Sequence, residues 1–159
     1  MLAVVLALAL GQLLPPELQP PTCMWGGVEI YCQSACTCSE VTNRLNLAKS
    51  EIESNWDDAP SDWWAGLQGW RIFITQKQYI PGPKNELLYG VTISGERRMV
   101  LSWDMCGVLH ELIHVQEIAA GTGHQRTDIY DHPLWERNSA VREISDRFRL
   151  RFRNRPPKL

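Results

Sequence analysis

Two histidines, at positions 110 and 114, constrain the fold of this chain more than any other residues. They lie in the run Val108–Ile118, which is typical of a helix. Residues four apart stack on one face of a helix, so the imidazoles of His110 and His114 must project to the same side. Glu111 follows His110 and is rotated by about 100° around the helix axis. The run therefore predicts a helix that carries two neighbouring imidazoles and a carboxylate beside them.

This arrangement suits zinc, which binds neutral imidazole nitrogens and has three protein ligands and a water in catalytic sites. The pattern H-E-x-x-H at residues 110–114 resembles the signature of the zincin metallopeptidases. The resemblance implies that His110 and His114 bind Zn²⁺ and that Glu111 is the general base for peptide hydrolysis. All four histidines of the chain fall between positions 110 and 132, as expected if they serve one centre.

A third metal ligand is expected from the residues that follow this helix. The segment Asp131–Trp135 resembles the segment that supplies the third histidine in SprT-like and related minimal metallopeptidases. That resemblance implies His132 as the third ligand, held at the start of a helix that begins near Pro133. Asp128 would instead follow the aspzincin arrangement, and Glu136 the thermolysin-like gluzincin one. The alternatives that the sequence leaves open are His124, Asp128 and Glu136.

Further periodic segments predict an α+β fold. A helix is expected over Glu40–Ser54 with Ser39 as its N-cap, and a second amphipathic helix is expected in the arginine-rich C-terminal part. Strand-like patterns lie between them, at 71–75, 87–94 and 98–103. Asp104 is expected to cap the helix with the two histidines.

This order of elements resembles a minimal zincin-like domain. The resemblance implies an N-terminal helix, a small and mostly antiparallel sheet, the active-site helix and a C-terminal helix. It also implies that residues 98–103 form the edge strand that offers backbone groups to an extended peptide. Glu117, three residues after His114, is expected beside that histidine or in solvent.

The N-terminal part predicts export. Residues 1–11 form an uncharged apolar run that is too short to cross a bilayer and resembles a secretory signal peptide. Residues 12–38 are expected to be a proline-rich linker followed by a cluster of cysteines, and residues 39–159 a zincin-like metallopeptidase domain. We therefore expect a secreted or periplasmic protein with no stable membrane span.

Four cysteines lie within sixteen positions, at 23, 32, 36 and 38, and their spacing does not match that of common zinc ribbons. In an exported chain they predict disulfide bonds, for which three pairings are possible. Cys106 is the fifth cysteine. It is expected to be either a small buried residue or the partner that ties the N-terminal segment to the active-site helix.

The formal net charge of −2 gives no indication of a nucleic-acid partner. The predicted function is that of a zinc-dependent metalloendopeptidase acting on a peptide or protein substrate, with Glu111 as general base. The alternative is a catalytically inactive, zinc-binding, protease-like module that acts in binding. The sequence leaves the substrate specificity and the oligomeric state open.

Overall fold

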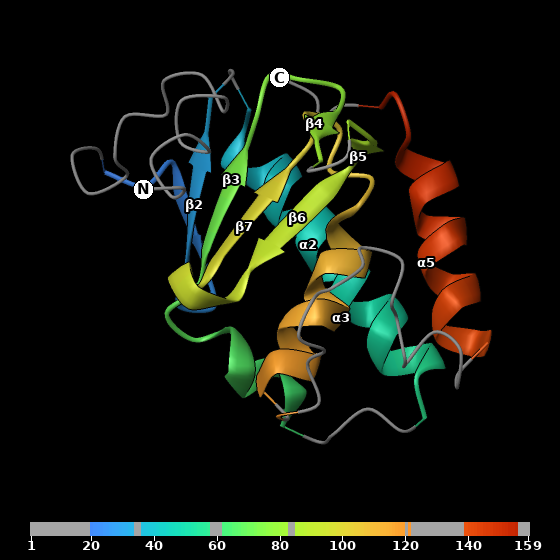
Figure 1. The fold of residues 1–159 in the computed structure, drawn as a ribbon. Coiled ribbons are helices and arrows are strands. Elements are labelled where there is room, and N and C mark those ends of the chain that lie inside the picture. Colours follow the sequence, from blue (N-terminus) through green and yellow to red (C-terminus); the bar gives the residue numbers. More distant parts are fainter. Residues whose placement is uncertain are drawn as a thin grey trace.

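The computed structural model describes residues 20–33, 36–57, 62–82, 85–119, 121 and 139–155. Within these ranges the chain contains three α-helices and a mixed five-stranded sheet, which confirms the α+β class (Figure 1). The helices are α2 (Cys38–Asn55), α3 (Val108–Ala119) and α5 (Ser139–Phe152). The expected signal peptide, residues 1–11, lies outside the described residues.

The sheet has the strand order β1-β2-β3-β7-β6. Its strands are β1 (Cys23–Trp25), β2 (Val28–Cys32), β3 (Arg71–Ile74), β7 (Arg98–Leu101) and β6 (Gly90–Ile93). A separate pair is formed by β4 (Ile80–Pro81) and β5 (Leu87–Leu88), and two 3-10 helices are η2 (Trp63–Leu67) and η3 (Ser94–Glu96). The strand patterns predicted at 71–75, 87–94 and 98–103 therefore recur as β3, as β5 with β6, and as β7, whereas β4 was not predicted.

The centre of the five-stranded sheet is parallel, in contrast to the mostly antiparallel sheet that we expected. Strand β3 pairs in parallel with both β2 and β7, whereas the outer strands β1 and β6 pair antiparallel with their neighbours. The reason is the position of α2, which lies between β2 and β3 in the chain. Such a helical crossover allows the next strand to run in the same direction as the previous one.

Strands β1 and β2 form a hairpin in a region that we expected to be linker and cysteine cluster. Gly26 and Gly27 have φ angles of 54° and 83°, and two consecutive glycines supply the positive φ values that a tight hairpin turn requires. Because β2 pairs with β3, one sheet contains strands on both sides of residue 39, where we expected the domain to begin.

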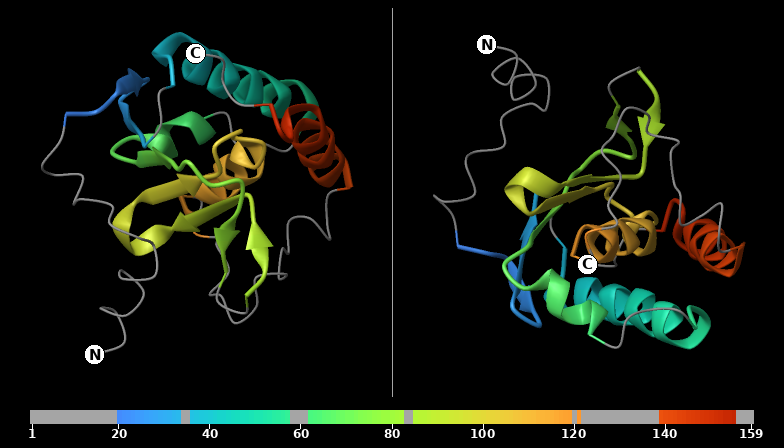
Figure 2. Two further views of the ribbon diagram at one scale, coloured as in Figure 1. Left: turned by 90° about the horizontal axis from the view of Figure 1, so that it is seen from above. Right: turned by 60° about the horizontal axis from the view of Figure 1, so that its bottom comes forward.

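The three helices lie on one side of the sheet, and α3 is between the sheet and α2 (Figure 2). Successive residues of a strand point to opposite faces. Accordingly, Ile72 and Met99 belong to the main core beneath the helices, whereas Phe73 and Val100 belong to a smaller cluster on the other face. Among the described residues, none of the helices has the length and apolar composition that crossing a bilayer requires.

Helix α2 begins slightly earlier than predicted. Its N-cap is Thr37 rather than Ser39, and the Thr37 Oγ1 accepts a hydrogen bond from the backbone N of Glu40 at 3.3 Å. Four of the five apolar residues expected on one face of this helix are buried, whereas the fifth, Leu47, is only half-buried. The buried residues are Val41, Leu45, Ala48 and Ile52.

Asp104 joins the end of α5 to the segment that precedes α3, instead of capping α3 as we expected. Its side chain is fully buried. Oδ1 accepts hydrogen bonds from Ser102 Oγ at 2.7 Å and from Cys106 N at 3.1 Å, and Oδ2 accepts one from Asn154 N at 2.8 Å. A single carboxylate thus satisfies three donors from two distant parts of the chain.

Replacing this carboxylate should destabilise the protein. We expect Asp104→Ala to lower the free energy of unfolding by about 3 kcal/mol, because buried donors lose their acceptor. Urea unfolding followed by tryptophan fluorescence measures the change. Asp62→Ala is the matched control, since Asp62 is exposed and its side chain makes no capping hydrogen bond. Equal stabilities of the two variants would contradict the role given to Asp104.

Candidate metal centre

Helix α3 places the predicted site in the interior of the protein. Nine of its 12 residues are buried, and they include Glu111, His114, Gln116 and Glu117. The helix packs against β6, η2, α2 and α5. At residue 66, a side chain as small as a methyl group would lie 2.6 Å from the Cβ of Ala119, so η2 approaches α3 closely only because Gly66 has no side chain. The polar groups of α3 therefore need partners within the fold.

The two histidines converge as the helical spacing predicts. The Nε2 atoms of His110 and His114 are 2.9 Å apart, and the ring centroids are 4.7 Å apart. Two nitrogens that each lie about 2.0–2.1 Å from a zinc ion in a tetrahedral shell are about 3.3 Å apart. A small outward movement of the two imidazoles would thus give their Nε2 atoms the separation of two zinc ligands, so the pair fits this metal.

Glu117 contacts the second histidine from the side opposite to its Nε2 atom. The Oε2 of Glu117 lies 3.2 Å from Nδ1 of His114, and both side chains are buried, with exposed fractions of 2% and 6%. Because a carboxylate accepts hydrogen bonds, Nδ1 carries the proton and Nε2 presents its lone pair toward His110. This is the imidazole tautomer that a metal needs, and its orientation is fixed by the carboxylate.

Strand β6 holds the carboxylate of Glu111. Thr92 Oγ1 donates a hydrogen bond to Glu111 Oε2 at 2.6 Å, and Glu111 is only 4% exposed. A Cβ atom on Gly90 would lie 2.5 Å from Glu111 Cγ, so the absence of a side chain at this position lets β6 approach the helix. Gly90 and Thr92 are two residues apart on one strand and hence face α3 together.

The edge strand beside α3 is β6, and not residues 98–103 as we expected. Strand β7 occupies an inner position, paired with β3 on one side and with β6 on the other. The chain passes through β6 first and then turns at η3 into β7, so the antiparallel partner takes the outer position. The backbone groups at this end of the sheet belong to Gly90–Ile93.

The third metal ligand falls outside the described residues. His132, the preferred residue, lies there, as do His124, Asp128 and Glu136. In the part of the chain that the structure describes, no group of three or more histidine, cysteine or acidic side chains is placed to hold a metal ion. The described part of the candidate centre therefore consists of the two imidazoles and their carboxylate neighbours.

Cys106 is a small buried residue before α3. Burial, followed by the charge of Asp104, raises the pKa of the Cys106 thiol to about 12. Zinc binds the thiolate form of cysteine, so this environment does not favour Cys106 as a ligand.

Sequence reasoning missed Gly90 and Thr92. The alternation over 87–94 indicated a strand, but not which helix would lie against it.

Comparison of the chain with protein-family models, with curated proteins and with solved structures returns no match. The candidate centre is therefore characterised by the two converging imidazoles of α3 and by the hydrogen bond from β6 to Glu111.

The contact between Glu117 and His114 predicts a change in zinc affinity. We expect Glu117→Gln to weaken zinc binding by roughly 10-fold, because the neutral amide holds Nδ1–H less strongly and lowers the basicity of Nε2. Competition with a chromophoric chelator measures the dissociation constant. Glu53→Gln is the control, since Glu53 pairs with Lys49 on the surface. An affinity of Glu117→Gln equal to that of the control would refute the orienting role.

Proposed function

We propose that this protein is a zinc-dependent metallopeptidase and that His110 and His114 are two of its metal ligands. The observation that carries the proposal is the convergence of the two Nε2 atoms at 2.9 Å, with Nδ1 of His114 bonded to Glu117. A carboxylate that accepts the other ring N–H is a common neighbour of a histidine that binds a metal. His132 is proposed as the third ligand, by its resemblance to the corresponding segment of SprT-like peptidases.

Zinc, when bound, would supply Lewis acidity, which polarises a peptide carbonyl and lowers the pKa of a water molecule. The carboxylate of Glu111 would take the proton of the attacking water and later deliver it to the leaving amine. Thr92 would keep this carboxylate in one rotamer through its hydrogen bond to Oε2. An extended peptide would pair with β6, the outermost strand on the side of α3.

One observation favours the alternative, a catalytically inactive zinc-binding module. Glu111 is almost completely buried and already accepts a hydrogen bond from Thr92. A carboxylate in such surroundings can serve to join a helix to a strand without taking part in proton transfer. The two functions share the metal and differ only in the role of Glu111, so one substitution separates them.

We also infer that the protein is secreted or periplasmic. Residues 1–11 resemble a signal peptide, and Cys32 and Cys36 form a disulfide. Disulfides persist in oxidising compartments and are rare in the cytosol. The disulfide is thus the structural observation that supports export.

The substitution Glu111→Gln tests the proposed base. We expect zinc content to stay at the wild-type level and hydrolysis of an unstructured protein such as casein to fall by about 10³-fold, because the amide cannot accept the proton. Metal analysis and peptide release measure the two quantities, and Glu53→Gln is the control. His110→Ala and His114→Ala should lose both zinc and activity. Wild-type protein that binds zinc and cleaves nothing would favour the inactive module, and undiminished cleavage by Glu111→Gln would exclude the proposed base.

Thr92 provides a second test of the same site. We expect Thr92→Val to lower kcat by roughly 10-fold with little change in KM, because the isosteric valine removes the hydrogen bond from Thr92 Oγ1 to Glu111 Oε2. Thr92→Ser retains the hydroxyl and should keep most of the activity. Steady-state kinetics on one peptide substrate compares the variants. Undiminished activity of Thr92→Val together with a loss in Thr92→Ser would show that the methyl group matters rather than the hydrogen bond.

A further inference from the structure

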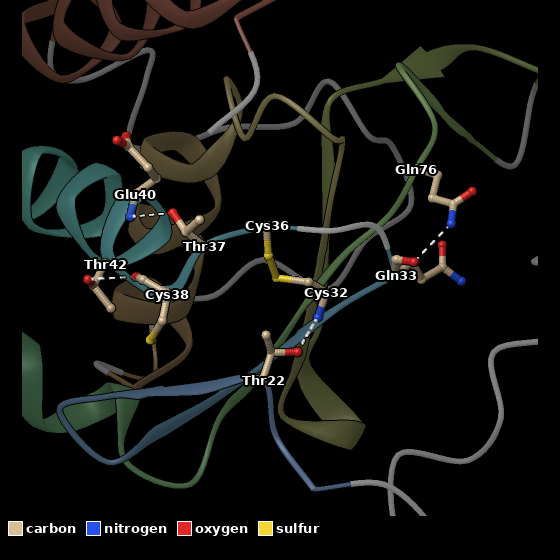
Figure 3. Close-up of a disulfide and its surroundings, with 9 residues drawn as sticks. All are labelled: Thr22, Cys32, Gln33, Cys36, Thr37, Cys38, Glu40, Thr42 and Gln76. Atoms are coloured by element: carbon tan, nitrogen blue, oxygen red, sulfur yellow. Dashed lines mark hydrogen bonds between the residues drawn. A yellow bond between two sulfur atoms is a disulfide. The ribbon is translucent and has the colours of Figure 1, made fainter. Parts of the chain in front are cut away.

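Four cysteines gather where the N-terminal hairpin meets the start of α2. Cys32, the last residue of β2, forms a disulfide with Cys36, and their Cα atoms are 6.3 Å apart (Figure 3). Cys36 lies two residues before Cys38, which begins α2. The existing bond therefore brings the first turn of α2 to the end of β2.

Cys23 reaches the same place from the neighbouring strand. Thr22 Oγ1 accepts a hydrogen bond from Cys32 N at 3.0 Å, and Cys23 pairs with Ile30 as the first residue of β1. The Cys38 thiol is near enough to contribute, after burial, to the raised pKa of the Cys23 thiol. A further link between β1 and α2, from Trp25 Nε1 to Asn46 Oδ1 at 2.8 Å, keeps the strand against the helix.

We propose that Cys23 and Cys38 form a second disulfide, which joins β1 to α2 and encloses the bond between Cys32 and Cys36. The hydrogen bond from Trp25 to Asn46 and the disulfide between Cys32 and Cys36 hold β1 and the start of α2 side by side, so Cys23 and Cys38 are neighbours in the folded chain. The remaining cysteine, Cys106, is surrounded by Ser102 and Asp104 before α3 and is not part of this group.

The chemistry requires a thiol–disulfide carrier, such as an oxidoreductase with a reactive disulfide or oxidised glutathione. Cys38 is exposed and is the thiol that such a carrier reaches, whereas Cys23 is only 7% exposed. The thiolate of Cys38 attacks a carrier sulfur and releases the first carrier thiol. Cys23 then loses its proton and attacks Sγ of Cys38, which releases the second carrier thiol. The two cysteines lose two electrons and two protons, and the carrier disulfide is reduced.

The geometry also orders the two thiols in this exchange. Burial raises the pKa of the Cys23 thiol to about 12, so its thiolate is scarce. Cys38 is exposed and therefore reacts with the carrier first, and Cys23 then attacks the mixed disulfide that Cys38 carries. The bond would fix β1, at the end of the sheet opposite to β6, and does not depend on the proposed peptidase activity.

Counting and locating thiols tests the proposal. The full chain, produced in an oxidising compartment, is denatured without reductant, alkylated and weighed. We expect one alkylated cysteine, Cys106, and a mass that equals that of the reduced chain minus four hydrogens plus one alkyl group. Three alkylated cysteines would overturn the proposal, since they would mean that only one disulfide forms.

Variants are needed to assign the pairing, because only Thr37 separates Cys36 from Cys38 and proteolysis cannot easily part them. Cys23→Ser should free Cys38, so that tandem mass spectrometry finds the added alkyl group there. The double variant Cys32→Ser/Cys36→Ser should keep one disulfide and one alkylated cysteine. Alkylation of Cys32 or Cys36 in the Cys23→Ser variant would overturn the proposed pairing, even if the double variant fails to fold.

Discussion

The burial of α3 imposes the constraint on which the rest of the structure depends. This helix lies between the sheet and α2, so each polar side chain that it carries must find a partner inside the protein. Glu111 accepts a hydrogen bond from Thr92 on β6, and His114 is hydrogen-bonded to Glu117 one turn further along the helix. The hydrogen bonds that make a buried polar helix tolerable are therefore the same ones that fix the orientation of the candidate catalytic groups.

Local patterns were sufficient to predict the elements of the site. The four-residue spacing of His110 and His114 determines their convergence once a helix forms, and the structure brings their Nε2 atoms together. The alternation in residues 87–94 likewise indicated the strand that contains Thr92. What the sequence could not indicate is that Thr92 meets Glu111, since this contact joins two elements whose relative placement depends on the whole sheet.

The hairpin β1–β2 and the position of β7 are two further features that the sequence did not predict. The Gly26–Gly27 pair allows a tight turn, but residues 12–38 were expected to be a proline-rich linker followed by a cysteine cluster, and no hairpin was predicted there. Strand β7 was expected at an edge because the order of elements resembles that of minimal zincins. Pairing in a sheet is not decided by order along the chain, and β6 took the outer position.

The central place of β3 has a consequence for how the chain reaches its native state. Both of its neighbours run parallel to it and lie far away in sequence, one before α2 and the other after β6. Parallel pairing of distant segments requires large loops to close before any stabilising contact forms. The entropic cost of closing these loops makes folding slow. A newly synthesised chain would thus spend time with unpaired strands, and early formation of the bond between Cys32 and Cys36, which ties the end of β2 to the start of α2, would reduce the number of segments left to assemble.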